Sequence, residues 1–178
     1  TSFFVPFASE EERVAEKRKA GYEGATMVYM GRLAYEKSLD DVLTAFWGAR
    51  KSVRDLRLVM IGDGPYRSAL ETKVRAMGLD SAVEFTGLKH ATKLRDALRI
   101  HDFFVTAATS ENMPTSVLEA MAAGLPVVAV AALGMPEIVQ DGKTGLLAPR
   151  GDITALTACI VRLASDSTLR SAYSRAAC

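Results

Sequence analysis

The chain has 178 residues, 49% of them hydrophobic and 24% charged, values that are typical of one globular domain and exclude wholesale disorder. Its formal net charge of +1 indicates no basic surface for nucleic acid and no polybasic patch for a membrane, so an anionic ligand would depend on a few placed cations and helix N-termini. Cys159 and Cys178 have neither metal-ligand spacing nor a disulfide framework, and reduced, cytoplasmic chemistry is expected. Glycine and proline interrupt the longest apolar stretch, residues 120–135, and apolar residues 3–7 are too few for a signal peptide.

Six short runs of β-branched or apolar residues predict strands, at residues 26–31, 56–62, 82–87, 102–107, 127–131 and 144–148. Most of these runs are continuous rather than alternating, as expected for strands buried on both faces of a parallel sheet. Helical segments separate them, and this alternation indicates right-handed crossovers. We therefore expect residues 1–178 to form a single α/β domain with a doubly wound, six-stranded parallel sheet of Rossmann-like architecture.

Helix-start and helix-stop residues mark the segments between the strands. Ser9 and Glu12 form a capping-box pattern with Gly21 as the stop, and Ser38 is the expected cap of a helix that runs to about Val53. The later signals are Pro65 and Gly78 at the two ends of a helix, Gly124 at the end of the helix that contains Glu119, and Asp152 before the last long helix, which turns Leu156, Ile160 and Leu163 inward.

Two cations follow the first predicted strand, in the segment Gly-Arg-Leu-Ala-Tyr-Glu-Lys at residues 31–37. Gly31 permits a sharp turn, after which Arg32 and Lys37 can both point above the edge of the sheet. A guanidinium fork and a movable ammonium beside a helix N-terminus suit a diphosphate. Taken alone, the segment also fits the commoner alternative of a solvated loop with surface charges.

Residues 62–65, Gly-Asp-Gly-Pro, close the second strand and are explained by a tight turn. Gly64 is expected to have a positive φ and Pro65 to occupy the first helical position. A dinucleotide fingerprint would need glycine at position 67, where the chain has Arg67, so an NAD or FAD site is excluded.

The end of the third predicted strand offers contacts for a nucleobase. Backbone groups of residues 85–90 can hydrogen-bond a base edge, with Leu88 or Lys89 lying over the ring. His90 follows in this loop and His101 opens the next strand, and without a visible partner both are expected to be structural or incidental. The sequence has no Ser-His-Asp or Cys-His arrangement and no Asp-x-Asp pair, so no metal site is expected.

Two glutamates, Glu111 and Glu119, flank the junction between the fourth strand and its helix. Ionised carboxylates accept hydrogen bonds from sugar hydroxyls, so the pair suits ribose and hexose binding better than proton transfer. Two alternatives stay open: Ser116 and Glu119 match a capping box, and Glu111 can serve the preceding turn or face water. Because such a pair is common by chance, it is informative only if it lies beside Arg32 and Lys37.

Taken together, these segments resemble the C-terminal, donor-binding domain of GT-B glycosyltransferases of the group 1, or GT4, family. The matching pieces, in family order, are Gly31-Arg32-x4-Lys37, Gly62-Asp63-Gly64-Pro65, Phe85-x-Gly87, Glu111-x7-Glu119-Ala120-Met121-Ala122-x-Gly124-x-Pro126-Val127-Val128 and Pro136-Glu137-Ile138-Val139-x-Asp141-Gly142-x-Thr144-Gly145-x-Leu147. Each piece is short, but their order over nearly the whole chain makes the resemblance specific.

The resemblance implies a role for each matching position. Arg32 and Lys37 would neutralise the donor diphosphate. Glu119 would bind the ribose hydroxyls, and Glu111, with a supporting part in catalysis, would contact the transferred sugar. The remaining contacts would be the backbone of Asn112, Met113, Pro114 and Thr115 for the sugar and phosphate, and Leu88 and Lys89 for the nucleobase. Enzymes of this family retain the anomeric configuration without a bound metal, which is consistent with a leaving diphosphate stabilised by fixed cations and helix N-termini.

The chain departs from the family pattern in three places. Asn112-Met113-Pro114 stands where the family often has Gly-Phe-Gly, so donor choice does not carry over, and Leu133 replaces a glycine that is common before Gly134. The N-terminal domain, which supplies the acceptor site and a histidine in the family, is absent, and His90 and His101 are not substitutes for that histidine. A start at Thr1 rather than Met indicates a fragment of a longer protein, although a processed N-terminus would look the same.

The sequence thus predicts the donor-binding half of a retaining glycosyltransferase, which would transfer a hexosyl group from a UDP- or GDP-sugar, without a cofactor, to a sugar or lipid acceptor held by the missing domain. The fragment alone would bind a nucleoside diphosphate and transfer no sugar. The full-length protein would be cytoplasmic, either free or peripheral to the inner face of the membrane. Two alternatives stay open, a nucleotide-sugar epimerase of GT-B architecture and a non-catalytic nucleotide-sugar binding module.

Overall fold

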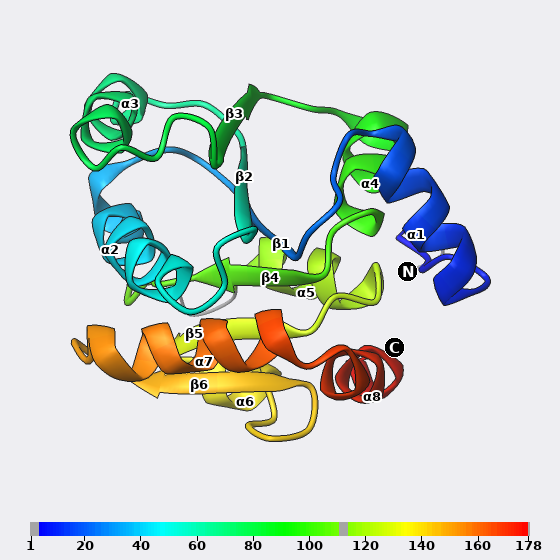
Figure 1. Cartoon of the computed structure of the whole chain (residues 1–178). Helices are drawn as coiled ribbons and strands as arrows, with labels where there is room; N and C mark the ends of the chain where they lie inside the picture. The colour runs from blue at the N-terminus through cyan, green and yellow to red at the C-terminus, as the bar shows by residue number, and fades with distance from the viewer. Residues whose placement is uncertain (1–3, 111–113, 178) are drawn as a thin grey trace.

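A six-stranded parallel sheet forms the centre of the protein (Figure 1). The computed structural model describes residues 4–110 and 114–177. The strands are β1 (Thr26–Met30), β2 (Arg57–Ile61), β3 (Val83–Gly87), β4 (Phe103–Thr106), β5 (Val127–Ala131) and β6 (Gly145–Pro149), in the order β3-β2-β1-β4-β5-β6. This is the doubly wound order, so the predicted fold class is confirmed, and every predicted strand agrees with an observed one to within one residue at each end.

Helices cover both faces of the sheet (Figure 1). They are α1 (Glu10–Lys19), the 3-10 helix η1 (Tyr35–Lys37), α2 (Leu39–Arg50), α3 (Arg67–Ala76), α4 (Ala91–Arg99), α5 (Thr115–Ala122), α6 (Met135–Ile138), α7 (Ile153–Ser165) and α8 (Ser167–Ala177). Apolar side chains of α2, α3 and α7 pack on one face, and those of α4, α5 and α6 on the other. Within the described ranges, no helix is long and apolar enough to cross a membrane.

The two-sided cover explains the continuous apolar runs of the sequence. In β1, Met27 and Tyr29 belong to the core on the α2 face, whereas Val28 and Met30 belong to the core on the α5 face. Successive side chains of a strand point to opposite faces, so a strand covered on both sides buries every residue. All five residues of β1 are buried, as this arrangement requires.

Most of the predicted helix ends are observed, with one exception. Ser9 accepts a hydrogen bond from the backbone N–H of Glu12, and Asp152 accepts one from the N–H of Ala155, so both are N-caps. Gly21, Gly78 and Gly124 all have positive φ at the predicted helix stops. The prediction for Ser38 is wrong in detail, because Ser38 has left-handed backbone angles and its side chain makes no cap hydrogen bond. The helix after it, α2, ends at Arg50 rather than near Val53.

Backbone hydrogen bonds join the loops that follow β1, β2 and β3 at the carboxyl edge of the sheet. They run from the N–H of Gly31 to the carbonyl of Ile61 (3.0 Å), from Leu33 to Asp63 (2.9 Å), from Gly62 to Gly87 (2.9 Å) and from Tyr66 to Leu33 (3.0 Å). A Cβ added at Gly62, where φ is 147°, would lie 1.9 Å from the carbonyl oxygen of Gly31. A Cβ added at Gly64 would lie 2.3 Å from the carbonyl oxygen of Leu33.

These contacts correct the prediction for Gly64. Its φ is not positive; the positive φ of this turn belongs to Gly62. Glycine is nevertheless required at both positions, because neighbouring backbone occupies the space of a side chain. The helix after Pro65 begins at Arg67, so Pro65 lies in the turn before the first helical residue.

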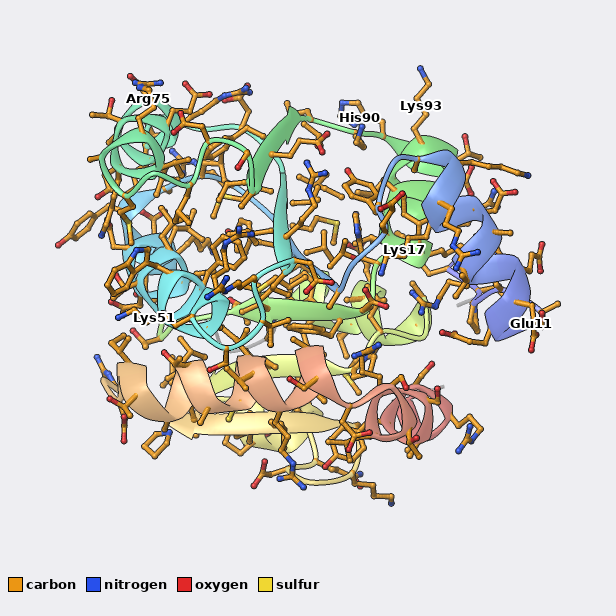
Figure 2. All side chains as sticks on the ribbon, viewed as in Figure 1. Glu11, Lys17, Lys51, Arg75, His90 and Lys93 are labelled. Atoms are coloured by element: carbon orange, nitrogen blue, oxygen red, sulfur yellow. The ribbon has the colours of Figure 1, made fainter. Side chains whose placement is uncertain are left out.

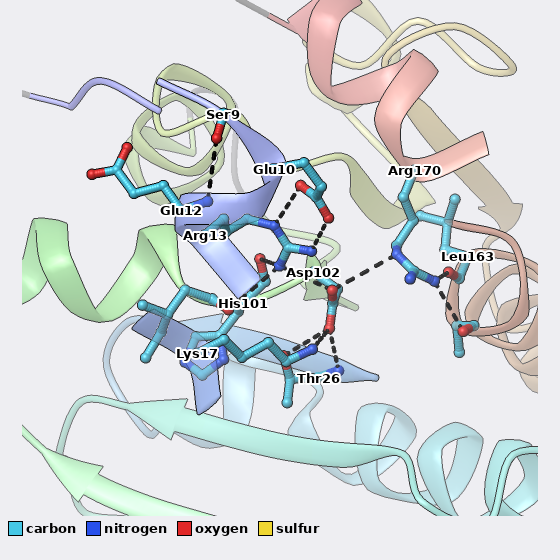
Figure 3. Close-up of polar contacts among 12 residues, drawn as sticks. Ser9, Glu10, Glu12, Arg13, Lys17, Thr26, His101, Asp102, Leu163 and Arg170 are labelled. Atoms are coloured by element: carbon cyan, nitrogen blue, oxygen red, sulfur yellow. Dashed lines mark hydrogen bonds and ion pairs between the residues drawn. The ribbon is translucent and has the colours of Figure 1, made fainter. Parts of the chain in front are cut away.

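At the opposite, amino edge of the sheet, one buried carboxylate ties four elements together (Figure 3). Asp102, just before β4, accepts hydrogen bonds from the backbone N–H (2.7 Å) and the hydroxyl (2.9 Å) of Thr26, the first residue of β1. Its side chain is 1% exposed and pairs with Lys17 and Arg13 of α1, and more distantly with Arg170 of α8. Burial by itself would raise the pKa of Asp102, but these cations, Lys17 foremost, hold it at about 2.

His101 lies beside this cluster and is buried in the neutral form. Its residue is 2% exposed, and its Nδ1 atom has no hydrogen-bond partner among the described residues. Burial lowers the pKa of His101 to about 3; Asp102 opposes the shift, and the charges of Lys17 and Arg13 add to it. Protonation of His101 is therefore coupled to unfolding.

Replacing Gly62 by alanine should destabilise the protein by about 3 kcal/mol or more, because the added methyl group collides with a carbonyl oxygen that β1 holds in place. Urea unfolding monitored by circular dichroism measures this cost. Gly142→Ala is the matched control, since Gly142 also has a positive φ (72°) but open space around its Cβ position, and it should cost only about 1–2 kcal/mol. Equal costs at the two positions would contradict the packing argument.

His101→Phe should flatten the pH dependence of stability between pH 6.5 and 5. Below its ordinary pKa of 6.5 this histidine binds a proton when the chain unfolds, whereas the folded form resists protonation down to about pH 3. Stability conferred by the neutral form is therefore lost as pH falls, by up to about 1.4 kcal/mol per pH unit. Unfolding free energies at pH 6.5, 5.75 and 5 test this, with His90→Asn as the control that should keep the wild-type slope, because His90 is exposed.

Candidate functional site

The carboxyl edge between β1 and β4 is the place where this fold offers a binding crevice. The chain runs outward from β1 to β2 and β3, then returns to place β4 on the other side of β1. In open α/β sheets, ligands bind outside the carboxyl ends of the strands at such a switch point. The predicted site residues belong to connections that begin at this edge of the sheet.

Arg32 and Lys37 lie on the connection from β1 to α2, just after Gly31 and at the end of η1. The side chain of Arg32 is 66% exposed and pairs with Glu36 only at 4.0 Å, a surface contact that contributes little energy. Lys37 comes two residues before α2, whose N-terminal N–H groups point to the same side. The structure thus places both cations at the switch point, and their binding of a diphosphate remains a prediction.

The connection from β4 to α5 lies beside η1. The hydroxyl of Ser110 donates a hydrogen bond to the carbonyl oxygen of Glu36, at 3.5 Å. The next three predicted site residues, Glu111, Asn112 and Met113, lie outside the described residues. Pro114 is buried with extended backbone angles, and Thr115, which is exposed, is the first residue of α5. Pro114 at the N-cap of α5 makes no side-chain cap hydrogen bond, so within the described residues no side chain caps the N–H groups of the first turn.

Glu119 lies in the second turn of α5 and is half-buried. The capping-box alternative is wrong, because Pro114 occupies the N-cap position and Ser116 lies inside the helix. Burial raises the pKa of the Glu119 carboxyl. No hydrogen bond or ion pair of this carboxylate is found within residues 4–110 and 114–177. A carboxylate that is partly desolvated and lacks a partner in this part of the chain is available to hydroxyl donors of a ligand.

Leu88 and Lys89 follow β3, two strands away from β1. Adjacent strands are about 4.8 Å apart, so this loop is offset by about 10 Å from the loop that carries Arg32. Leu88 is 66% exposed and can cover a planar ring without loss of core packing. Arg67 stands nearby, with its guanidinium carbon 5.9 Å from the centre of the Phe85 ring. The assignment of a nucleobase to this loop is not tested by these contacts.

Neither histidine takes part in the carboxyl-edge site. His90 is the exposed residue before α4, and its side chain makes no cap hydrogen bond. His101 is buried at the amino edge, among the side chains around Asp102 (Figure 3). Within the described ranges no group of three or more His, Cys, Asp or Glu side chains could hold a metal ion.

Three features of this edge were not predicted from the sequence. Tyr35, on η1 between the two cations, is 77% exposed and packs edge-on against Tyr66, with ring centres 5.7 Å apart. Tyr29 reaches the Arg32 backbone from inside the core, with its hydroxyl 3.0 Å from the Arg32 carbonyl oxygen. Leu133, noted in the sequence as a departure from glycine, has a φ of 46°, a left-handed conformation that glycine adopts more easily.

A cavity of about 620 Å³ lies at the amino edge, away from these residues. Its wall includes Arg13, Arg99, His101, Gly124 and Arg170. Arg13 and Arg170 are already paired with Asp102, and Arg99 donates to the carbonyl oxygen of Pro6. These cations are already engaged within the protein, whereas the exposed Arg32 and the Glu119 carboxylate, which has no partner within residues 4–110 and 114–177, lie at the carboxyl edge.

Comparison with known proteins identifies the family and the fold. The sequence model of the family described as "Glycosyl transferases group 1" matches residues 10–178. Sulfoquinovosyl transferase SQD2 of Arabidopsis thaliana is 36% identical over 99% of this chain and 33% of its own length. The alpha-monoglucosyldiacylglycerol synthase of Streptococcus pneumoniae is 31% identical over 78% of this chain and 32% of its own length. The chain thus spans about a third of the length of these two relatives.

Solved structures show the same fold. The C-terminal domain of a group 1 glycosyl transferase, LpcC of Francisella tularensis, superimposes with a TM-score of 0.86 at 26% identity, over 98% of this chain and 92% of that one. Anabaena Alr3699/HepE in complex with UDP and glucose superimposes with a TM-score of 0.83 at 21% identity, over 96% of this chain and 47% of that one. The family match over residues 10–178 shows that the chain belongs to the group 1 glycosyl transferases, and its fold is that of their C-terminal domain.

Proposed function

We propose that this chain is the donor-binding domain of a retaining glycosyltransferase that transfers a hexosyl group from a UDP- or GDP-sugar. The observation that carries the proposal is the position of Arg32 and Lys37. Both lie on the connection after β1, at the switch point of the sheet, next to the N-terminus of α2 and to the loop that leads into α5. A doubly charged diphosphate needs such a set of cations and N–H groups.

The rest of the donor is assigned as the resemblance to the family implies. On the β4 side, Glu111 would contact the transferred sugar and the backbone of residues 112–115 would line its pocket. Glu119 would accept hydrogen bonds from the ribose hydroxyls, since its carboxylate has no partner within residues 4–110 and 114–177. On the β2 and β3 side, Leu88 and Lys89 would hold the nucleobase.

These residues would act on the leaving group rather than move protons. As the bond to the sugar breaks, negative charge develops on the diphosphate, and Arg32, Lys37 and the helix N-termini would stabilise it in place of a metal ion. Glu111 would position the sugar.

Names of related proteins support the substrate class. One relative, from Mycolicibacterium smegmatis, is a GDP-mannose-dependent mannosyltransferase acting on a phosphatidylinositol monomannoside, and Anabaena HepE has been crystallised with UDP-glucose. The name of the pneumococcal relative, alpha-monoglucosyldiacylglycerol synthase, also refers to a lipid. We infer that the complete protein holds a sugar or lipid acceptor on a further domain, is cytoplasmic or peripheral to the inner face of the membrane, and that this chain alone transfers no sugar.

Arg32→Ala and Lys37→Ala should each weaken the binding of UDP or GDP by about tenfold, because a hydrogen bond to a charged group contributes about 1.5–3 kcal/mol and exposure reduces it. Isothermal titration calorimetry with UDP, GDP and ADP measures the loss. Arg75→Ala and Lys51→Ala are matched controls, since these cations lie in the last turn of α3 and just after the end of α2, away from the N-terminal ends of those helices (Figure 2).

Absence of binding to all three nucleotides, or equal losses in the controls, would overturn the proposal. The complete protein separates the remaining alternatives. Conversion of the donor sugar without an acceptor would indicate a nucleotide-sugar epimerase, and nucleotide binding without conversion or transfer would indicate a non-catalytic module.

Glu119→Gln should weaken UDP or GDP binding by about five- to tenfold without lowering the unfolding free energy of the free protein at pH 7. The raised pKa means that the ionised form of Glu119 costs stability above its ordinary pKa, and that this cost disappears as pH falls, so a neutral amide relieves it. The affinity falls because the amide loses a charge-assisted acceptor. Glu16→Gln, which removes an exposed partner of Lys19, should change neither quantity by much.

A further inference from the structure

Tyr29 links the core of the protein to the loop that carries the two cations. It lies in β1, is 3% exposed, and packs in the core on the α2 face of the sheet. Its hydroxyl donates a hydrogen bond to the carbonyl oxygen of Arg32, three residues further along the chain, at 3.0 Å. A buried side chain of the sheet thus fixes the backbone of an exposed residue.

Gly31 makes this contact possible. The chain reverses tightly at Gly31, where φ is 154°, and a Cβ there would lie 2.9 Å from the Tyr29 hydroxyl oxygen. A side chain at position 31 would therefore displace either the hydroxyl or the turn. The N–H of Gly31 is held by the carbonyl of Ile61 in β2, so the turn itself is anchored to the sheet.

Within residues 4–110 and 114–177, few contacts outside the core restrain Arg32. Its side chain is 66% exposed, and its pairing with Glu36 at 4.0 Å is weak. The restraints act on its backbone from the side of the core. The Tyr29 hydroxyl donates a hydrogen bond to the Arg32 carbonyl, and the N–H of Leu33, the next residue, donates one to the carbonyl of Asp63. These contacts on the buried side of the loop therefore set the direction in which the Arg32 side chain leaves the backbone.

We propose that Tyr29 is a positioning residue for the donor diphosphate, whose hydroxyl holds the Arg32 backbone so that the guanidinium is presented to the phosphates. This inference rests on the proposed function. In this role Tyr29 acts through Arg32. Its contribution should therefore vanish when the guanidinium is removed, whereas a purely structural contribution would persist.

A double-mutant cycle tests the inference. Tyr29→Phe removes the hydroxyl and keeps the ring, and it should weaken UDP or GDP binding, measured by calorimetry, by about three- to tenfold, the value of one buried neutral hydrogen bond. In the Arg32→Ala background the same substitution should have no further effect, since the two residues act as one unit. Tyr22→Phe is the matched control: its hydroxyl donates to Glu84 at 2.7 Å, on a different part of the sheet, and its loss should leave affinity unchanged.

The outcomes are distinct. Unchanged affinity of Tyr29→Phe, or an equal loss with and without the Arg32 guanidinium, would overturn this inference and leave the proposed function standing. A loss of affinity in Tyr22→Phe as large as in Tyr29→Phe, at a similar fall in melting temperature, would also overturn it, because general destabilisation would then suffice. Absence of nucleotide binding by the wild-type chain would overturn the proposed function and this inference together.

Discussion

The close approach of backbone at the carboxyl edge is the constraint on which the candidate site depends. The loops after β1 and β2 come so near that neither Gly62 nor Gly64 has room for a Cβ, and hydrogen bonds between main-chain groups close the gap. Side chains at these positions would push the loops apart and move Arg32 away from the sheet. Main-chain contact also removes the freedom that a loop of this length normally has, so an exposed cation with only a weak ion pair can keep a defined position.

The two edges of the sheet divide stability and binding between them. At the amino edge the charges around Asp102 are paired. Asp102 forms ion pairs with Lys17 and Arg13, accepts hydrogen bonds from Thr26, and so joins α1, β1, β4 and α8. A buried carboxylate left without its cations would cost several kcal/mol, so this cluster fixes how the terminal helices meet the sheet. At the carboxyl edge, Arg32 is exposed and only weakly paired, and the partly desolvated carboxylate of Glu119 has no partner within residues 4–110 and 114–177. A partly desolvated carboxylate of this kind is a candidate for ligand binding.

Much of the fold could be predicted from the sequence, because burial on both faces leaves an unbroken apolar run that does not depend on distant contacts. The predictions that are wrong lie where tertiary contacts override a local sequence signal. Ser38 and Ser116 are typical cap residues, yet the chain begins one helix from a left-handed residue and the other from Pro114. Gly64 was assigned to a turn, although contact with Leu33 is what requires glycine. The Asp102 cluster and α8 were missed altogether, since partners 85 residues apart, such as Lys17 and Asp102, leave no pattern in the sequence.

The candidate site, like the fold, could be predicted only where local sequence patterns mark it. Arg32, Lys37 and Glu119 were predicted as site residues because their types and order match a family, while the reason for their placement lies in residues that carry no chemistry. Tyr29 looks like an ordinary strand residue, and only the structure shows its hydroxyl on the Arg32 carbonyl. Leu133 is the opposite case, a residue that the sequence marks as a departure from glycine. Its left-handed backbone nevertheless has the conformation that glycine would adopt, at a cost in stability of about 1–2 kcal/mol.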